Sequence, residues 1–139
     1  MNQGFNVRTS QSDEWQTPRW VFDALDAEFG FTLDGAASEA NKLCKRFTGA
    51  GCGIQEWAGE RVFCNPPYSD IMPFVWRAFD AELAVLLLPV RTDSDWHRVL
   101  QECDVELRYW RKRIAFLQNG KEMDSPRFAS LVAIVKGRA

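Results

Sequence analysis

Two consecutive prolines, Pro66 and Pro67, directly follow a short, β-rich apolar run in the middle of this 139-residue chain. Each proline fixes its φ at about −65° and lacks an N–H donor, and the second proline biases Pro66 towards an extended backbone. The pattern predicts a strand that ends in a stiff, exposed turn from Asn65 to Tyr68. Because the carbonyls of Asn65 and Pro66 have no place in a helix or a sheet ladder, we expect them to be available to a ligand.

The side chains and carbonyls of this turn could bind a planar amine such as adenine. The side-chain oxygen of Asn65 and the carbonyl of Pro66 can accept two hydrogen bonds from one NH₂ group, while the ring of Tyr68 stacks on the ring that carries it. Asn before proline also opens ordinary turns, so a purely structural role stays open. In this context Asn-Pro-Pro-Tyr resembles the catalytic motif of amino-group methyltransferases, which methylate exocyclic amines of nucleic-acid bases or the side-chain amide of glutamine.

The length and charge of the chain limit what it can contain. A chain of 139 residues forms one domain, with no room for a separate recognition domain. Residues 1–12 are polar and without periodicity, which predicts a flexible tail before a single domain at 13–139. The net charge of −2 argues against a nucleic-acid binder that relies on its overall charge, so phosphate contacts would depend on local charge.

Several other classes of protein are disfavoured. The longest apolar run, Leu83–Pro89, is far shorter than the ~20 residues of a membrane span, and the start of the chain has no signal-peptide pattern. We therefore expect no membrane partner and a cytoplasmic location. The four cysteines form no Cys-x-x-Cys pair, and the one histidine, His97, fits a solvated or packing role, so no metal site is predicted.

The hydrophobic pattern predicts alternating helices and strands. Thr17 suits an N-cap and Pro18 the first helical position, which predicts a helix over 18–29 that ends at Gly30. The further predicted elements are a strand at 31–34, a polar helical stretch at 39–42, a loop at 43–59, a helix capped by Ser69 or Asp70, a strand at 84–89, a helix from Thr92 or Asp93 to about 101, a strand at 105–110, a polar loop at 118–127 and a last strand at 128–136. This order favours an α/β fold with a mainly parallel sheet, helices on both faces and an antiparallel C-terminal element.

Two further segments have the character of ligand sites. Asp34 stands at the end of a predicted strand and is followed by Gly35 and Ala36, small residues that let a ligand approach the backbone. Asp34 could equally cap the turn that follows it. The helix beginning at Thr17 and Pro18 resembles the segment of amino-methyltransferases that binds the cofactor carboxylate, since a helix N-terminus attracts anions.

A basic segment follows the strand predicted at 105–110. Arg111, Lys112 and Arg113 come directly after Tyr109 and Trp110. Cations interleaved with aromatic residues can neutralise phosphates and stack on unpaired bases. A solvated sheet edge protected by Lys and Arg explains the same pattern equally well, so both interpretations stay open.

From Asp13 to Lys136 the chain resembles the small phage-encoded DNA N-6-adenine methyltransferases, the Dam-like phage proteins. The resemblance is carried by residues 13–18, 31–37, 64–68, 87–93 and 111–116. It implies a reduced Rossmann-like methyltransferase fold, S-adenosylmethionine as the methyl donor, adenine in DNA as the acceptor, and a phage or prophage protein acting in a bacterial cytoplasm. The implied residues are, for catalysis, Asn65, Pro66, Pro67 and Tyr68; for the cofactor, Thr17, Pro18, Asp34, Gly35, Ala36 and Asn65; and, for DNA, Arg91, Arg111, Lys112 and Arg113.

The sequence departs from the usual pattern of these enzymes in two places. One glycine and two alanines follow Asp34, where a richer glycine pattern is usual. A second strand ending in an acidic residue for the cofactor ribose is not recognisable, and Glu39, Asn41 and Glu56 stay open as substitutes. Two other functions also stay open: methylation of a glutamine amide in protein, and a non-catalytic phage protein that binds DNA or protein.

Overall fold

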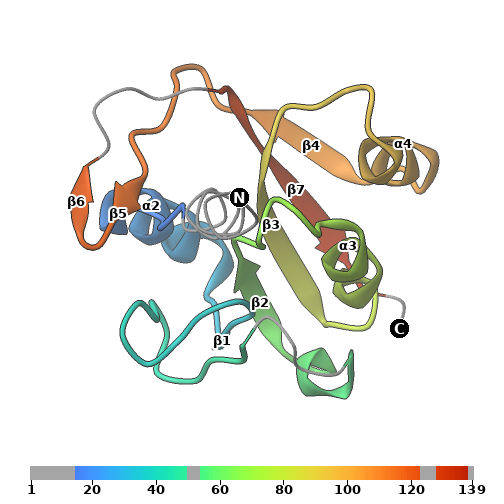
Figure 1. Ribbon diagram of the computed structural model, residues 1–139. Coiled ribbons are helices and arrows are strands. Elements are labelled where there is room, and N and C mark those ends of the chain that lie inside the picture. The colour runs from blue at the N-terminus through green and yellow to red at the C-terminus, as the bar shows by residue number, and fades with distance from the viewer. Residues whose placement is uncertain (1–14, 50–53, 123–127, 138–139) are drawn as a thin grey trace, which may run out of the picture.

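A computed structural model describes residues 15–49, 54–122 and 128–137, built around a five-stranded mixed sheet of order β1-β2-β3-β7-β4 (Figure 1). The predicted N-terminal tail lies outside the described residues. The strands of this sheet are β1 (Leu33–Asp34), β2 (Arg61–Cys64), β3 (Leu83–Pro89), β4 (Glu106–Tyr109) and β7 (Ser130–Lys136). A separate hairpin joins β5 (Leu117–Gln118) to β6 (Lys121–Glu122) within the segment predicted as a polar loop.

The sheet divides into a parallel and an antiparallel half. β1 pairs with β2 and β2 with β3 in parallel, whereas β7 runs antiparallel to both β3 and β4. The predicted antiparallel C-terminal element is confirmed. The sheet as a whole is mixed, because β7 inserts between β3 and β4 and makes both of its ladders antiparallel.

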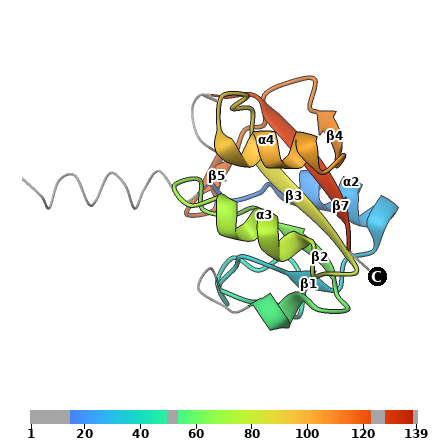
Figure 2. The same ribbon diagram turned by 90° about the vertical axis from the view of Figure 1, so that its right-hand side faces the viewer.

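Helices cover both faces of the sheet. The helices are α2 (Arg19–Phe29), α3 (Met72–Ala78), α4 (Asp95–Glu102) and a short 3₁₀ turn, η1 (Ile54–Trp57). Helix α2 packs with Phe63, Val85 and Leu87 on one face, while α3 and α4 lie together on the other (Figure 2). Successive buried side chains of β2 and β3 point alternately to the two faces of the sheet, with the period of two expected of strands.

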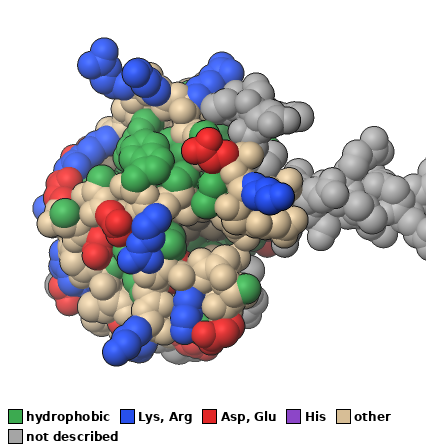
Figure 3. Space-filling view, turned by 90° about the vertical axis from the view of Figure 1, so that its left-hand side faces the viewer, with side chains coloured by type: hydrophobic (Ala, Val, Ile, Leu, Met, Phe, Trp, Pro, Cys, Tyr) green, Lys and Arg blue, Asp and Glu red, His purple; other side chains and the backbone are tan. Residues whose placement is uncertain are grey.

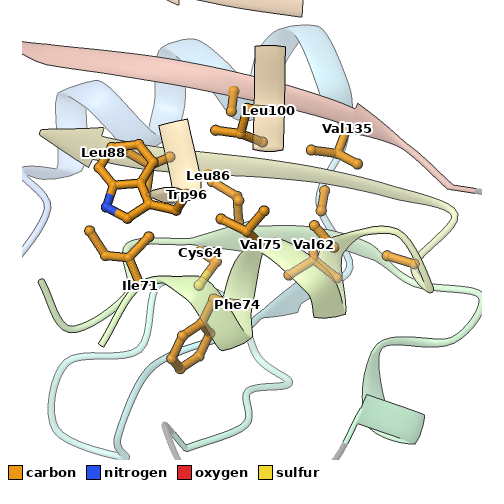
Figure 4. Close-up of a cluster of buried hydrophobic side chains, with 14 of the residues drawn as sticks. Val62, Cys64, Ile71, Phe74, Val75, Leu86, Leu88, Trp96, Leu100 and Val135 are labelled. Carbon is orange, nitrogen blue, oxygen red and sulfur yellow. The ribbon is translucent and has the colours of Figure 1, made fainter. Parts of the chain in front are cut away.

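The face under α3 and α4 holds the larger core. Figure 4 shows the side chains of Leu86 and Leu88 with those of Ile71, Val75 and Trp96. All seven residues of β3 are buried, which explains why its sequence is a continuous apolar run rather than an alternating one. Burial of each Leu or Val side chain of β3 stabilises the fold by about 2 kcal/mol, so this strand contributes strongly to the stability of the sheet.

The start of α2 differs from the prediction. Pro18 is the N-cap residue, and the helix has no side-chain cap. The hydroxyl of Thr17 accepts a hydrogen bond from the side chain of Asn65 instead. The predicted end is confirmed, because Gly30 adopts φ 64°, a left-handed conformation that glycine accommodates without strain.

The predicted caps of α3 and α4 are also wrong by one or two residues. Ile71, not Ser69 or Asp70, is the N-cap residue of α3 and makes no side-chain cap bond. This is possible because Pro73 in the first turn has no N–H that needs a partner.

In α4 the capping residue is Ser94, not Thr92 or Asp93. The Ser94 side chain accepts from the N–H of His97 at 3.3 Å. His97 itself is buried, with Nε2 3.4 Å from the hydroxyl of Tyr109. The packing role considered for His97 is confirmed.

The polar helical stretch predicted at 39–42 is a turn. The N–H groups of Asn41 and Lys42 donate to the carbonyl of Ser38, at 3.2 and 3.0 Å, and the chain does not continue as a helix. Four residues make too short a helix to stand without packing, and Glu39 to Asn41 are all exposed.

Candidate active site

The side chain of Asn65, directly after β2, is oriented by the segment that precedes α2. Its Nδ2 donates to the backbone carbonyl of Trp15 and to Oγ1 of Thr17, the latter at 3.0 Å. Because a backbone carbonyl only accepts, these bonds fix which end of the amide is nitrogen. Oδ1 is left buried and without a hydrogen-bond partner in the described part of the chain. The turn from Asn65 to Tyr68, called the corner below, therefore holds a side-chain oxygen of fixed orientation that accepts no hydrogen bond from the described residues.

The backbone of the same corner adds a second acceptor. No backbone N–H of the described residues donates to the carbonyl of Asn65 or of Pro66, whereas the carbonyl of Pro67 accepts from the N–H of Asp70 at 3.1 Å. The expectation that these two carbonyls stay out of helix and sheet ladders is met. Two neighbouring residues thus offer acceptors on a backbone stiffened by prolines.

Asp34 closes the neighbouring strand, β1, where it pairs with Phe63 of β2. The carboxylate is 3% exposed, and both of its oxygens accept backbone hydrogen bonds, from Ala36 at 3.3 Å and from Leu43 at 3.1 Å. Burial raises the pKa of Asp34, against the lowering effect of the Leu43 and Ala36 N–H groups. Asp34 therefore ties down both ends of the loop from 36 to 43.

Gly35 is required by packing. A Cβ atom at this position would lie 2.8 Å from Cγ1 of Val62 and closer still to the ring of the buried Trp57. Its N–H donates to the carbonyl of Phe63 at 2.7 Å. The close neighbour of this glycine in the structure is an indole ring, while the approach of a cofactor to the same backbone stays a prediction.

A cavity of about 110 Å³ lies between the ends of β1 and β2. It is lined by Trp15, Gln16, Thr17, Asp34, Ala36, Asn41, Leu43, Phe63 and Asn65. Thr17, Asp34, Ala36 and Asn65, which the sequence nominated from three separate segments, are thus brought together. Of the three residues left open for the cofactor ribose, only Asn41 is among this lining; Glu39 and Glu56 are not.

The cavity continues into a groove of about 500 Å³ that shares four of its lining residues. The groove adds Arg19, Ala40, Lys42, Leu117, Asn119 and Gly120. Its walls are the start of α2, the loop after β1 and the β5–β6 hairpin. The N–H of Gln16 donates to the carbonyl of Leu117 at 2.9 Å, and the reverse bond has the same length, so the hairpin is fixed to the cavity wall.

The segment 46–48 extends the sheet beyond β1. Phe47 forms a parallel bridge with Asp34, whose N–H donates to Arg46 and whose carbonyl accepts from Thr48, at 3.0 and 2.9 Å. This short pairing occupies the place beside β1 where a second strand was sought in the sequence. It lies inside the segment predicted as a loop, and it contains no acidic residue.

Tyr68 is buried, so the prediction of an exposed turn is wrong for this residue and for Pro66. The ring packs edge-on against Phe116 and Phe128, with ring centroids 6.5 and 5.5 Å apart. Phe128 also packs edge-on against Trp15, with centroids 5.2 Å apart. Burial raises the pKa of the Tyr68 hydroxyl, which has no hydrogen-bond partner among the described residues.

Comparison with known proteins gives this geometry a family. The family model described as DNA N-6-adenine-methyltransferase (Dam) matches residues 4–137. The chain belongs to the Dam family.

Two relatives of this Dam-family chain are phage proteins named DNA N-6-adenine-methyltransferase. The relative from Haemophilus phage HP1 (strain HP1c1) is 31% identical over 146 residues, which cover 96% of this chain and 84% of the relative. The relative from Escherichia phage T1 is 30% identical over 159 residues, which cover 96% of this chain and 66% of the relative. No solved structure shows a significant match.

The basic residues nominated in this Dam-family chain lie outside the cavity. Arg91, Arg111, Lys112 and Arg113 are all exposed, and none of them lines the cavity. Arg91 lies close enough to the corner for its charge to favour ionisation of Tyr68. No ion pair within the described residues involves Arg91, Arg111 or Lys112, so these charges are available to an anion.

The sequence did not reveal the aromatic residues around the corner of this Dam-family site. Trp15 and Phe116 lie in segments that carry the family resemblance, and this was the one signal for them. Phe128 gave no signal, since its contacts with Trp15 and Tyr68 join residues far apart in the chain.

The described residues contain neither a cluster of metal-binding side chains nor a membrane-spanning helix. Over 15–49, 54–122 and 128–137 no group of His, Cys, Asp and Glu side chains could hold a metal ion. No helix in these ranges combines the length and apolar character needed to cross a bilayer.

Proposed function

We propose that this Dam-family protein transfers a methyl group from S-adenosylmethionine to the exocyclic 6-amino group of adenine in DNA. The observation that carries the proposal is the buried Oδ1 of Asn65, an acceptor fixed in orientation and lacking a partner within the described residues. Such an atom is costly to bury unless a ligand supplies the donor. The NH₂ group of adenine is a donor of this kind.

The role of the corner is to make the amino nitrogen nucleophilic. The lone pair of this nitrogen is delocalised into the purine ring, so the amine alone is unreactive. Hydrogen bonds from its two hydrogens to Oδ1 of Asn65 and to the carbonyl of Pro66 favour a pyramidal nitrogen with a localised lone pair. When bound, S-adenosylmethionine supplies an electrophilic methyl group on a sulfonium. Transfer would form a C–N bond as the S–C bond breaks, which leaves the donor as a neutral thioether, and the proton lost from the amino nitrogen would pass to solvent.

The cavity and its groove fit a donor of this type. The N–H groups of Arg19 and Trp20, the first two of α2, donate to no backbone carbonyl of the described residues and follow Thr17 closely in the chain, so they favour the carboxylate of the methyl donor. We assign Thr17, Pro18, Asp34, Gly35 and Ala36 to the cofactor site. Asn41, which lines both the cavity and the groove, is the best-positioned of the three ribose candidates.

The topology supports a reduced Rossmann-like methyltransferase fold. The three parallel strands β1, β2 and β3 all end at the side of the sheet where the cavity opens, as ligand sites do in α/β sheets. Helix α3 connects β2 to β3, which gives a parallel crossover. We propose that residues 13–139 form a single catalytic domain that acts in the cytoplasm of a bacterial host.

DNA contacts are assigned to the exposed cations and to the corner itself. Arg91, Arg111, Lys112 and Arg113 would neutralise phosphates. In a duplex the target base must be extruded, at a cost of a few kcal/mol, and stacking on Tyr68 would offset part of this. Because the Tyr68 ring is only 7% exposed, stacking requires it to separate from Phe116 or Phe128.

The test is incubation of the protein with DNA and S-adenosylmethionine, followed by nuclease digestion and mass spectrometry of the nucleosides. N6-methyladenine should appear with wild-type protein and be absent with Asn65→Ala. Unmethylated DNA together with a methylated glutamine amide in added protein would replace this proposal by the alternative substrate. Calorimetric titration that finds no binding of S-adenosylmethionine would replace it by a non-catalytic role.

A further inference from the structure

Two tryptophans form an exposed aromatic step on the surface beside α2. Trp20, in the first turn of α2, is 56% exposed and packs edge-on against Trp110, with ring centroids 5.9 Å apart and an interplanar angle of 62°. Trp110 directly follows β4 and is half-buried. A large exposed indole that is fixed by a second one presents a flat, apolar surface to solvent, which is unfavourable unless a partner covers it.

Cations surround this step. Arg111, Lys112 and Arg113 follow Trp110 in the sequence and are exposed, and Arg19 precedes Trp20. Arg19 pairs with Asp23 at 3.2 Å, whereas Arg111 and Lys112 form no ion pair within the described residues. Figure 3 shows this side of the molecule, with hydrophobic side chains at the surface, Lys and Arg side chains above them, and side chains of both charges beside and below them. The segment 111–113 consists of three cations, although the chain as a whole carries a net charge of −2.

The step adjoins the cavity through two covalent connections. Trp20 is the second residue of α2 and directly follows Arg19, which lines the groove. The basic segment leads through Phe116 to Leu117, which is hydrogen-bonded to Gln16 in the cavity wall. A ligand bound on the step is therefore close to the groove that leads to Asn65.

We propose that Trp20, Trp110 and the segment 111–113 bind an unpaired DNA strand next to the target base. Trp20 stacks on one base, and Arg111 and Lys112 contact the phosphates that flank it. An exposed aromatic ring close in the fold to the exposed cations Arg111 and Lys112, which form no ion pair within the described residues, matches a partner that alternates flat bases with anionic phosphates. Stacking on an indole tolerates every base, so this surface adds affinity without sequence preference. The assignment of DNA as the partner rests on the proposed function.

The experiment measures binding of the whole protein to fluorescently labelled oligo(dT), without cofactor. Oligo(dT) contains no adenine, so this binding is independent of methyl transfer. Trp20→Ala should weaken binding about fivefold or more, and Trp20→Phe should keep most of it. Trp76→Ala is the matched control, because Trp76 is 47% exposed but lies on α3, on the opposite face of the sheet. Its binding should equal that of wild type.

A salt titration separates the two components of the surface. Replacing Arg111 and Lys112 by Gln should reduce the slope of log K against log salt by about 1.4, since each phosphate contact to a single strand contributes about 0.7. Trp20→Ala should leave this slope unchanged.

Three results would overturn the proposal. The first is wild-type binding of oligo(dT) by Trp20→Ala, and the second is an equal loss with Trp76→Ala. The third is a dimer, seen by sedimentation, that Trp20→Ala dissociates, because a second copy would then be the partner of the step. If oligo(dT) binds as expected while no methylated adenine is found, the surface stands and the proposed reaction fails. If adenine is methylated but oligo(dT) does not bind, the proposed reaction stands and the proposed surface fails.

Discussion

The ends of β1 and β2 carry two polar side chains that line one cavity but differ in their remaining hydrogen-bonding capacity. Asp34 uses both carboxylate oxygens to accept N–H groups of its own loop. Asn65 uses its amide N–H groups on Trp15 and Thr17 and keeps a buried oxygen without a partner within the described residues. Both side chains stand at a strand end with buried oxygens, so the unused acceptor of Asn65 is what distinguishes the proposed catalytic residue from Asp34.

The residues that follow each side chain explain the difference. Asp34 accepts from the N–H two residues later, at Ala36, the usual local bond of an Asp in a turn. Asn65 cannot form this bond, because Pro66 and Pro67 have no N–H. The two prolines thus keep the Asn65 oxygen available by removing the donors that would otherwise capture it.

The largest expected effect on stability comes from Asp34. Asp34→Ala leaves the partly buried N–H groups of Ala36 and Leu43 without acceptors, so the free energy of unfolding should fall by about 2 kcal/mol. Denaturant unfolding followed by circular dichroism measures this. An unchanged midpoint of unfolding would show that the Asp34 carboxylate does not stabilise the loop, and would contradict the structural role given to it here.

The contribution of Asp34 to the free energy of unfolding should depend on pH. Burial raises the pKa of Asp34 in the folded state, so the folded protein binds its proton more tightly than the unfolded chain does. Stability contributed by the neutral form is lost as pH rises from the ordinary aspartate pKa of about 3.9 through the raised value. Asp34→Asn lacks this loss, so its stability relative to wild type should increase over that range. A constant difference would contradict the assignment.

Pro67→Ala should convert the Asn65 corner into one that resembles Asp34. The new N–H, two residues after Asn65, competes for Oδ1, so kcat should fall about tenfold with little change in KM. Pro73→Ala in the first turn of α3 is the control for a proline replaced outside the site, and its kcat should equal that of wild type. Equal kcat values for both variants would show that donor exclusion has no part in catalysis.

Thr17→Val should have a smaller effect on the same amide. Without the Thr17 hydroxyl, Nδ2 of Asn65 keeps only the Trp15 carbonyl, so we expect about a fivefold loss of kcat. Thr17→Ser retains the acceptor and should restore the rate. If Thr17→Val binds S-adenosylmethionine more weakly but has an unchanged kcat at saturation, Thr17 acts in cofactor binding alone.

The smallest effect concerns the hydroxyl of Tyr68. It is buried and unpaired in the described part of the chain, so Tyr68→Phe should be neutral or stabilising by less than about 1 kcal/mol. Thermal unfolding measures this directly. A loss of stability larger than that would indicate a partner for the hydroxyl.

Local sequence patterns predicted the frame of the site well. The prolines after β2 and the glycine that ends α2 act through their own backbone, and the carboxylate at the end of β1 accepts from the loop that directly follows it, so these positions follow from nearby residues. The apolar run of β3 likewise predicted a strand buried on both faces.

Contacts between distant residues were not predictable in this way. The bonds from Asn65 to Trp15 and Thr17 span 50 and 48 residues, and they replaced the N-cap bond that local chemistry predicts for Thr17. The burial of Tyr68 depends on Phe116 and Phe128, which reach it only after the chain has folded. Tertiary packing therefore decided both the orientation of the amide and the exposure of the ring.

The central claim is that Oδ1 of Asn65 accepts the amino group of the target adenine. It is tested most directly by comparing wild type and Asn65→Ala in two measurements: single-turnover methyl transfer from labelled S-adenosylmethionine to an adenine-containing oligonucleotide, and calorimetric binding of the same donor. We expect transfer to fall by about 10² or more, while donor affinity stays close to that of wild type. Wild-type-like labelling of the oligonucleotide by Asn65→Ala would contradict the claim.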